Sequence, residues 1–342
     1  MLDSMEKKIS HPGETKSEVL KRIPKACVDE TAAVEFLEQQ RWGDMPTCPH
    51  CDSAEVVKVM NADGTVRSER FLWRCHGECK GQFTVRVGTI MEDSRIPLRF
   101  WCHAFWRACS SKKGVSASQI SRECSITYKS ALFLMHRIRF AMATPKVEEK
   151  LTGTVESDET WVGGKPRRKG MSKRGWGTNK TPVLAMVQRP GKVRARVITD
   201  VTAKTLKREM FKAIDLSARL CTDELRSYRG IGKKFAGGHG TVCHSAEEYV
   251  NESGDSVNTA ECFFSLLKRK FYGTHHAVSK KHLHRYISEA EFHWNTRKCD
   301  DGERIWAAIT GSEGKRLMYR QPVKKENPPE SGVADTPAQP IG

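Results

Sequence analysis

Two closely spaced pairs of cysteines constrain the fold of this chain more than any other feature. Cys48 and Cys51 are separated by two residues, and Cys75 and Cys79 are separated by three. Two thiolate pairs on separate turns can surround one Zn²⁺ ion tetrahedrally. Strand-like segments lie around them at 55–60, 71–74 and 82–88. We therefore predict a zinc ribbon, rather than four unconnected buried thiols. Four ligands leave no open coordination position, so this zinc is expected to be structural. The longer second spacing leaves open whether His76 takes part.

Helical patterns lie on both sides of the predicted ribbon. Before it, a helix is expected at 29–42, capped by Asp29 and ended by Gly43. After it, helices are expected at 94–113, 116–123 and 127–140. The last two, joined by a tight turn, form a helix-turn-helix pattern, in which the second helix meets base edges near its N-terminus. Candidate DNA contacts are therefore Thr127, Tyr128 and Lys129. The alternative is a packed three-helix bundle without DNA contact.

From residue 151 onward the pattern changes to mixed α/β. Strands are expected at 151–157, 182–188, 193–199, 218–222 and 241–244, and helices at 205–214, 260–271 and 281–294. The segment 193–199 alternates apolar and basic residues, which is typical of a half-buried strand. In this order the first and fourth strands can end side by side.

Three acidic residues stand out in the α/β region. Asp158 follows the first strand, Asp223 follows the fourth, and Glu261 lies in the helix 260–271. Carboxylates repel one another, so holding three together costs stability unless cations bind among them. Oxygen ligands suit Mg²⁺ or Mn²⁺. We predict that these acids converge on divalent ions that act on DNA phosphates, although each could instead be a solvated surface charge.

Other acidic and basic residues lie beside these three. Glu156 and Glu159 are expected on the opposite strand face or in solvent, and His244 is expected to be structural. Lys268 follows Glu261 by two helical turns, on the same helix face, where it could meet a phosphate. A basic loop at 165–177 predicts a clamp on the DNA backbone, with a solvated loop as the alternative. Its candidate contacts are Lys165, Arg167, Arg168, Lys169, Lys173 and Arg174.

The overall charge favours a polyanionic partner. The 342 residues carry a formal net charge of +17, which favours nucleic acid binding. No apolar run is long enough for a membrane span, and the N-terminus has no apolar signal core. We therefore expect a cytoplasmic protein, associated with the nucleoid, that has no membrane partner and keeps its cysteines as thiols or metal ligands.

Several long motifs, in the right order, resemble bacterial insertion-sequence transposases that carry an N-terminal zinc ribbon and an ISXO-type DDE domain. The motifs are 88–98, 158–165, 223–228, 258–269, 272–283 and 292–295. The resemblance covers roughly residues 30 to 310 and implies a ribonuclease-H-like catalytic fold. It also implies Mg²⁺ dependence and the movement of an element with short inverted terminal repeats. Asp158 and Asp223 would be the first two metal ligands, and Glu261, or alternatively Asn258, the third.

Three functions follow from this resemblance and from the residues themselves. The first is a transposase that cuts and joins element ends by two-metal-ion phosphoryl transfer, working on double-stranded DNA as a homo-oligomer. The second is a catalytically inactive, zinc-dependent DNA-binding protein derived from a transposase. The third is a metal-dependent nuclease that hydrolyses DNA without joining it.

The expected fold class is multi-domain α/β, with five parts along the chain. These are a disordered tail (1–28), an N-terminal helix and zinc ribbon (29–92), a helix-turn-helix domain (93–144), a ribonuclease-H-like DDE domain with a mixed sheet (145–310), and a second disordered tail (311–342).

Overall fold

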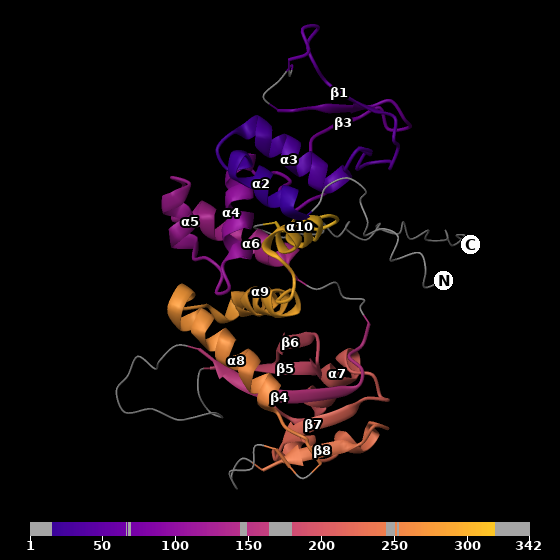
Figure 1. The fold of residues 1–342 in the computed structure, drawn as a ribbon, viewed down its shortest axis with the longest axis vertical. Helices are drawn as coiled ribbons and strands as arrows, with labels where there is room; N and C mark the ends of the chain where they lie inside the picture. The colour runs from indigo at the N-terminus through magenta and orange to yellow at the C-terminus, as the bar shows by residue number, and fades with distance from the viewer. Residues whose placement is uncertain are drawn as a thin grey trace, which may run out of the picture.

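The computed structural model describes residues 16–65, 67, 70–143, 149–163, 180–243, 250, 251 and 253–318, apart from the side chains of 16 and 17. A small ribbon lies at one end of the molecule, a group of helices lies in the middle, and a five-stranded sheet lies at the other end (Figure 1). The predicted fold class, a zinc ribbon followed by helices and a mixed α/β sheet, is confirmed. None of the described helices is long and apolar enough to cross a membrane.

The ribbon is a three-stranded antiparallel sheet made of β1 (Val56–Lys58), β2 (Trp73–Cys75) and β3 (Gln82–Phe83). It packs on helix α3 (Glu30–Trp42) through aromatic rings. The ring of Trp42 meets those of Trp73 and Phe83 edge-on, with centroids 5.8 and 5.9 Å apart. The indole Nε1 of Trp73 donates a hydrogen bond of 2.7 Å to Glu38 of α3. These contacts bury an apolar face that two or three short strands could not bury alone.

The predicted helices after the ribbon are α4 (Leu98–Ser110), α5 (Ala117–Glu123) and α6 (Tyr128–Ala141). Ser116 and Thr127 cap α5 and α6 through their side-chain oxygens, as serine and threonine do at helix starts. Ser125, in the turn between these helices, has a φ of 53°. The helix-turn-helix arrangement is therefore present, and α4 and α6 bury their apolar faces in one core.

Two further helices belong to this core and were not predicted. α2 (Lys16–Ala26) lies where the sequence suggested a disordered tail, and it buries Val19 and Ile23. α10 (Asp301–Thr310) lies in the range assigned to the catalytic domain, yet it buries Ile305 and Ile309 in the helical core. Residues 311–318 also pack here rather than forming a tail: Lys315 Nζ donates hydrogen bonds to the carbonyls of three residues at the end of α6, namely Phe140, Ala141 and Ala143.

The large sheet has the strand order β6-β5-β4-β7-β8. Its strands are β4 (Thr154–Val162), β5 (Thr181–Arg189), β6 (Val193–Val197), β7 (Arg219–Asp223) and β8 (His239–Val242). β4, β5 and β6 are antiparallel, whereas β7 and β8 run parallel to β4. This mixed arrangement is the predicted ribonuclease-H-like sheet, and it places the first and fourth strands side by side, as expected.

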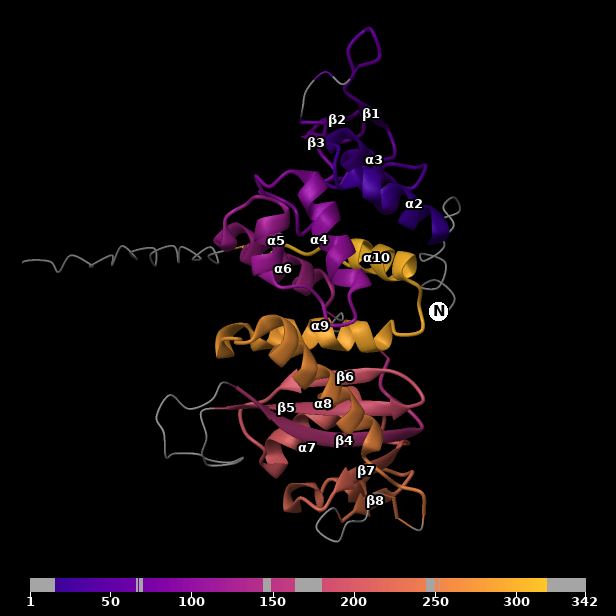
Figure 2. The same cartoon turned by 60° about the vertical axis from the view of Figure 1, so that its left-hand side comes forward.

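Helices cover both faces of this sheet (Figure 2). α8 (Asn258–Lys270) and α9 (Leu283–Asn295) pack on the face that carries Val183, Ala185 and Val187. α7 (Ala203–Ala213) packs on the opposite face, against Leu184 and Met186. Short helical turns at Arg226–Tyr228, Gly232–Lys234, Phe271–His275 and Lys280–His282 complete the described elements.

Candidate active site

Asp158 and Asp223 occupy neighbouring positions on parallel strands. The register of β4 and β7 pairs Ser157 with Thr222, so Asp158 and Asp223 stand at the next position. Val155 and Leu220 belong to the core on the α7 face of the sheet. Because side chains alternate along a strand, Asp158 and Asp223 both project toward the α8 face. Asp223 is the last residue of β7, so its side chain lies at the C-terminal end of that strand.

Glu156 was expected on the strand face opposite Asp158 or in solvent, and both expectations are wrong: its side chain is buried beneath α8 and anchors that helix. It is fully buried and lies on the same strand face as Asp158. The backbone N–H groups of Thr259 and Ala260 donate to Glu156 Oε2 over 2.7 and 2.9 Å, and the Thr259 hydroxyl donates to Oε1. An ion pair with Arg189 completes the set. A carboxylate at a helix N-terminus is stabilised by the unpaired N–H groups there, so Glu156 holds the start of α8 against β4.

This anchor determines where the candidate third acids lie. Asn258 is the first residue of α8, and Glu261 lies two residues after Thr259. Asn258, Glu261 and Lys268 are all exposed on the side of α8 away from its buried stripe of Ala260, Phe263, Phe264 and Leu267. Within the described residues, the three acids Asp158, Asp223 and Glu261 do not form a group whose oxygens all lie within 4.8 Å of one another.

Glu159, the residue after Asp158 in β4, has a raised pKa. Its side chain points to the strand face opposite that of Asp158. It accepts a hydrogen bond of 2.8 Å from the hydroxyl of Tyr228, a residue of the core on the α7 face. Burial, together with the charges of Asp223 and Asp158, raises the pKa of Glu159 to about 7, against the opposing effect of the Tyr228 hydrogen bond. The predicted placement of Glu159 on the other strand face is therefore right. Burial is the larger cause of the raised pKa, and the two aspartates add to it because both lie close to Glu159.

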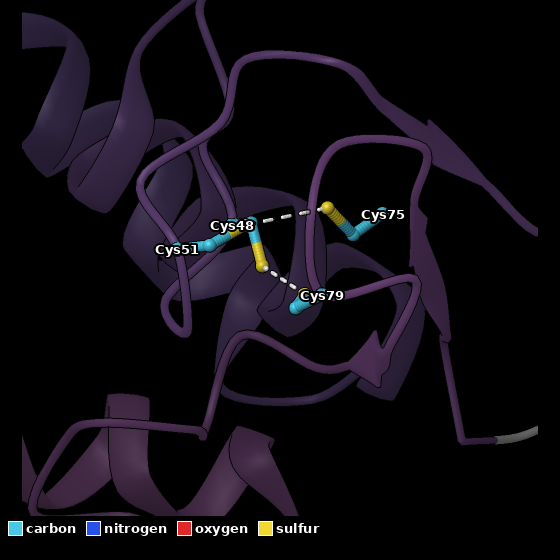
Figure 3. Close-up of side chains that lie close together, drawn as sticks. All are labelled: Cys48, Cys51, Cys75 and Cys79. Carbon is cyan, nitrogen blue, oxygen red and sulfur yellow. Dashed lines mark hydrogen bonds between the residues drawn. The ribbon is translucent and has the colours of Figure 1, made fainter.

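The four predicted cysteine ligands come together at the other end of the molecule (Figure 3). Their sulfurs all lie within 4.8 Å of one another, with Cys48 and Cys79 3.5 Å apart and Cys51 and Cys75 3.6 Å apart. Zn–S bonds of about 2.3 Å around a tetrahedral ion require sulfurs roughly 3.8 Å apart, so the cluster fits Zn²⁺. His76 is not in this group.

The knuckle geometry explains why the cysteines can meet. Backbone N–H groups of Gly77 and Gly81 point at the sulfurs of Cys75 and Cys79, at 3.3 and 3.5 Å. A side chain at Gly77 would have its Cβ 2.5 Å from that of Ser53. Glycine is needed here so that the two loops can approach each other.

The candidate DNA contacts of the helix-turn-helix are available on the surface. Thr127, Tyr128 and Lys129 are all exposed at the start of α6, and the Tyr128 side chain keeps 57% of its surface accessible. The basic loop contacts from Lys165 to Arg174, and His244, lie outside the described residues. The strands on either side of that loop are described: β4 ends at Val162 and β5 begins at Thr181. Asp158 therefore lies inside β4, four residues before its end, and does not follow the strand as the sequence predicted.

Comparison with known protein families gives two matches. The model of an ISXO2-like transposase domain matches residues 150–295, and that of a transposase zinc-ribbon domain matches residues 28–82. An uncharacterized protein in transposable element ISH50 of Halobacterium salinarum is 30% identical over 280 residues. That alignment covers 77% of this chain and 90% of the relative.

Likeness to solved structures is weaker. A chain of the simian T-cell lymphotropic virus intasome, solved in complex with PP2A regulatory subunit B56 gamma, is 11% identical, with a TM-score of 0.25 over 51% of this chain. This chain spans 63% of that protein, less than two thirds of its length. The Mos1 transposase in a paired-end complex with the left transposon end is 13% identical, with a TM-score of 0.24 over 59% of this chain and 75% of that chain.

Proposed function

The chain belongs to the ISXO2-like transposase family, and we propose that it is a DNA transposase that cuts and joins the ends of an insertion sequence. The observation that carries the proposal is the register of β4 and β7, which aligns Asp158 with Asp223 on the α8 face of the sheet. The four-cysteine ribbon would hold a structural Zn²⁺, which leaves the acidic edge as the site for chemistry.

In this proposal Asp158 and Asp223 are the first two ligands of Mg²⁺ or Mn²⁺, and Glu261 of α8 is the third, with Asn258 as the alternate. The oxygen donors suit these ions, and the register that brings Asp158 beside Asp223 places two like charges together that cations would relieve. When bound, two such ions would activate the attacking water or 3′-hydroxyl and stabilise the leaving oxygen.

The remaining residues would hold the DNA in line. Glu156 keeps α8 fixed on the sheet, so that Glu261 and Lys268 keep a constant distance from β4. Lys268 would contact a phosphate, and the basic loop between β4 and β5 would neutralise the backbone beside the site. Thr127, Tyr128 and Lys129 would read the terminal repeat. We further propose that the protein acts in the cytoplasm at the nucleoid, as a homo-oligomer on double-stranded DNA.

A strand-transfer assay on labelled element ends tests this function. With Mg²⁺ or Mn²⁺, the wild type is expected to nick the ends and join them to a target duplex, and Asp158→Ala is expected to do neither. Full strand transfer by Asp158→Ala would contradict the proposal. Binding of the ends without cutting would indicate an inactive DNA-binding protein, and hydrolysed ends without joined products would indicate a nuclease.

A further inference from the structure

A single buried carboxylate joins the helix-turn-helix to the helix that carries Glu261. Glu289 of α9 is completely buried. Its Oε2 accepts a hydrogen bond of 2.9 Å from Nε of Arg139, on α6, and lies 3.2 Å from Nζ of Lys270, the last residue of α8. Both cationic side chains are also buried, at 1% and 4% exposure. Three helices from two parts of the molecule therefore meet at one oxygen atom.

Further contacts close around this carboxylate. The guanidinium of Arg139 lies 4.0 Å from the ring centroid of Tyr286, also on α9. In the loop between α4 and α5, Gly114 approaches so closely that an added Cβ would lie 2.5 Å from Glu289 Oε1. The loop therefore needs glycine at this point, where φ is +71°. Residues of the α4–α5 loop, α6 and α8 therefore surround this carboxylate of α9.

The charges are arranged to stay paired. Burial alone would raise the pKa of Glu289, but the charges of Lys270 and Arg139 outweigh burial and lower it. Burial lowers the pKa of Lys270 to about 8, against the opposing effect of Glu289. Buried ion pairs of this kind add little net stability compared with apolar packing, and their best-supported role is to select one arrangement of the elements they join.

The arrangement selected here bears on the candidate active site. Lys270 lies nine residues beyond Glu261 on α8, which is about 14 Å along a helix axis. Because Glu156 holds the Glu261 end of α8 against β4, loss of the Glu289 contacts would shift α6 relative to α8. A rotation of about 10° over this length would move DNA bound at α6 by roughly 2 Å relative to Glu261. Displacements of about 1 Å are enough to slow a reaction by roughly 100-fold.

We propose that Glu289 is a positioning residue that sets where the DNA is cut. By holding α6 and α8 in one arrangement, it fixes the distance from the sequence bound at α6 to the phosphate that is brought to Asp158 and Asp223. This inference rests on the proposed function.

The test compares Glu289→Gln with the wild-type full chain on a duplex that carries a labelled terminal repeat. Glutamine keeps the shape of the side chain but removes both ion pairs. We expect cutting at the native position to slow by roughly 100-fold and the remaining cuts to spread over neighbouring phosphates, while affinity for the duplex changes less than about twofold. A merely structural role would lower all cutting without moving it.

Glu209→Gln is the matched control, because Glu209 of α7 also pairs with one arginine and one lysine, Arg208 and Lys212, but the side chains of both partners are exposed. It is expected to leave the cut position and rate unchanged. If Glu289→Gln fails to fold, Arg139→Lys takes its place. Lysine keeps the charge but loses the planar guanidinium that bonds Glu289 and stacks on Tyr286, and it is expected to broaden the cut positions to a smaller extent.

Amide hydrogen exchange gives a readout that does not depend on activity. In Glu289→Gln or Arg139→Lys, exchange is expected to rise in α6 and at the end of α8, while β4, β5 and the ribbon stay as in the wild type. A variant with wild-type exchange and wild-type cut position would overturn the inference. A wild type that does not cut would refute the proposed function, and the exchange experiment alone would then decide whether Glu289 couples the helices.

Discussion

The two candidate metal sites of this protein are built in opposite ways. The cysteines of the ribbon come from two short knuckles, and their sulfurs already lie within 4.8 Å of one another. The acids of the sheet come from two strands and a helix, and Asp158, Asp223 and Glu261 are not gathered to that degree. Thiols can be packed closely before a metal binds, whereas carboxylates carry like charges that repel. The first site therefore suits a structural ion, whereas the proposed acid site would need cations to bring its carboxylates together.

The largest loss of bound metal and of stability should follow removal of one cysteine ligand from the ribbon. Cys75→Ser is expected to lower bound zinc from about one ion per chain to none and to unfold the ribbon, because structural zinc contributes on the order of 10 kcal/mol to the folding of small metal-binding domains. Metal analysis and circular dichroism would measure this. Cys299→Ser, at a half-buried cysteine outside the cluster, serves as the control and should keep its zinc. A stable ribbon without zinc would break the comparison.

Removal of one acid from the sheet should instead reduce activity without reducing stability. Asp223→Asn is expected to slow the cutting of element ends by roughly 1,000-fold, yet to leave the melting temperature equal to or above that of the wild type, since a charge that repels the neighbouring acids is gone. Asp215→Asn changes an aspartate in a turn before β7, where it accepts from Ser217, and should leave cutting unchanged. A marked fall in stability of Asp223→Asn would mean that this acid is structural.

Glu156 sharpens the comparison, because it is an acid of the same strand that does behave as a structural group. Glu156→Gln is expected to lower the free energy of unfolding by about 3 kcal/mol. The reason is that the Arg189 guanidinium and the N–H groups at the start of α8 lose the negative charge that they bind. Urea denaturation would measure the change. Ion pairs with exposed partners contribute only about 0–1 kcal/mol, so Glu209→Gln should change the free energy of unfolding little. Equal effects of the two variants would argue against an anchoring role for Glu156.

The smallest effect, taken per unit of pH, concerns histidine, the third common type of metal ligand. Burial, together with the charges of Arg139 and Arg285, lowers the pKa of His136 to about 3. At His136 the folded protein therefore binds fewer protons than the unfolded chain between pH 3 and 6.5, so the contribution of His136 to stability should fall as pH drops below about 6.5, by at most about 1.4 kcal/mol per pH unit. Burial also lowers the pKa values of His275 and His293 to about 3, and these residues add contributions of the same sign. Above pH 6.5 these contributions are constant. His136→Asn should reduce the slope, and a slope that responds to added zinc would instead identify a metal ligand.

Features that depend on residues close together in the chain could be predicted from the sequence. The cysteine knuckles, the cap at Asp29 and the order of the strands are all local patterns, and the structure has each of them. The pairing of the first and fourth strands was expected as an arrangement that this strand order allows, and the structure has it.

The missed features depend on partners far along the chain. Glu156 bonds residues 103 and 104 positions later, and no local pattern reveals which strand face a distant helix will cover. α10 was missed although a signal was present: Asp300 and Glu303 form a capping box, and apolar residues follow at helical spacing. α2 carries an internal proline, Pro24, which weakens its helical pattern, and the core that stabilises it is formed mostly by later residues.

The most direct test of the acid site is a crystal of the wild-type protein grown with Mn²⁺ and element-end DNA, in which anomalous scattering locates the ion. The account predicts a peak about 2 Å from carboxylate oxygens of both Asp158 and Asp223, with Glu261 or Asn258 beside it, and no such peak in Asp223→Asn. Manganese bound at a place that neither aspartate touches, in a complex that still cuts the DNA, would contradict it.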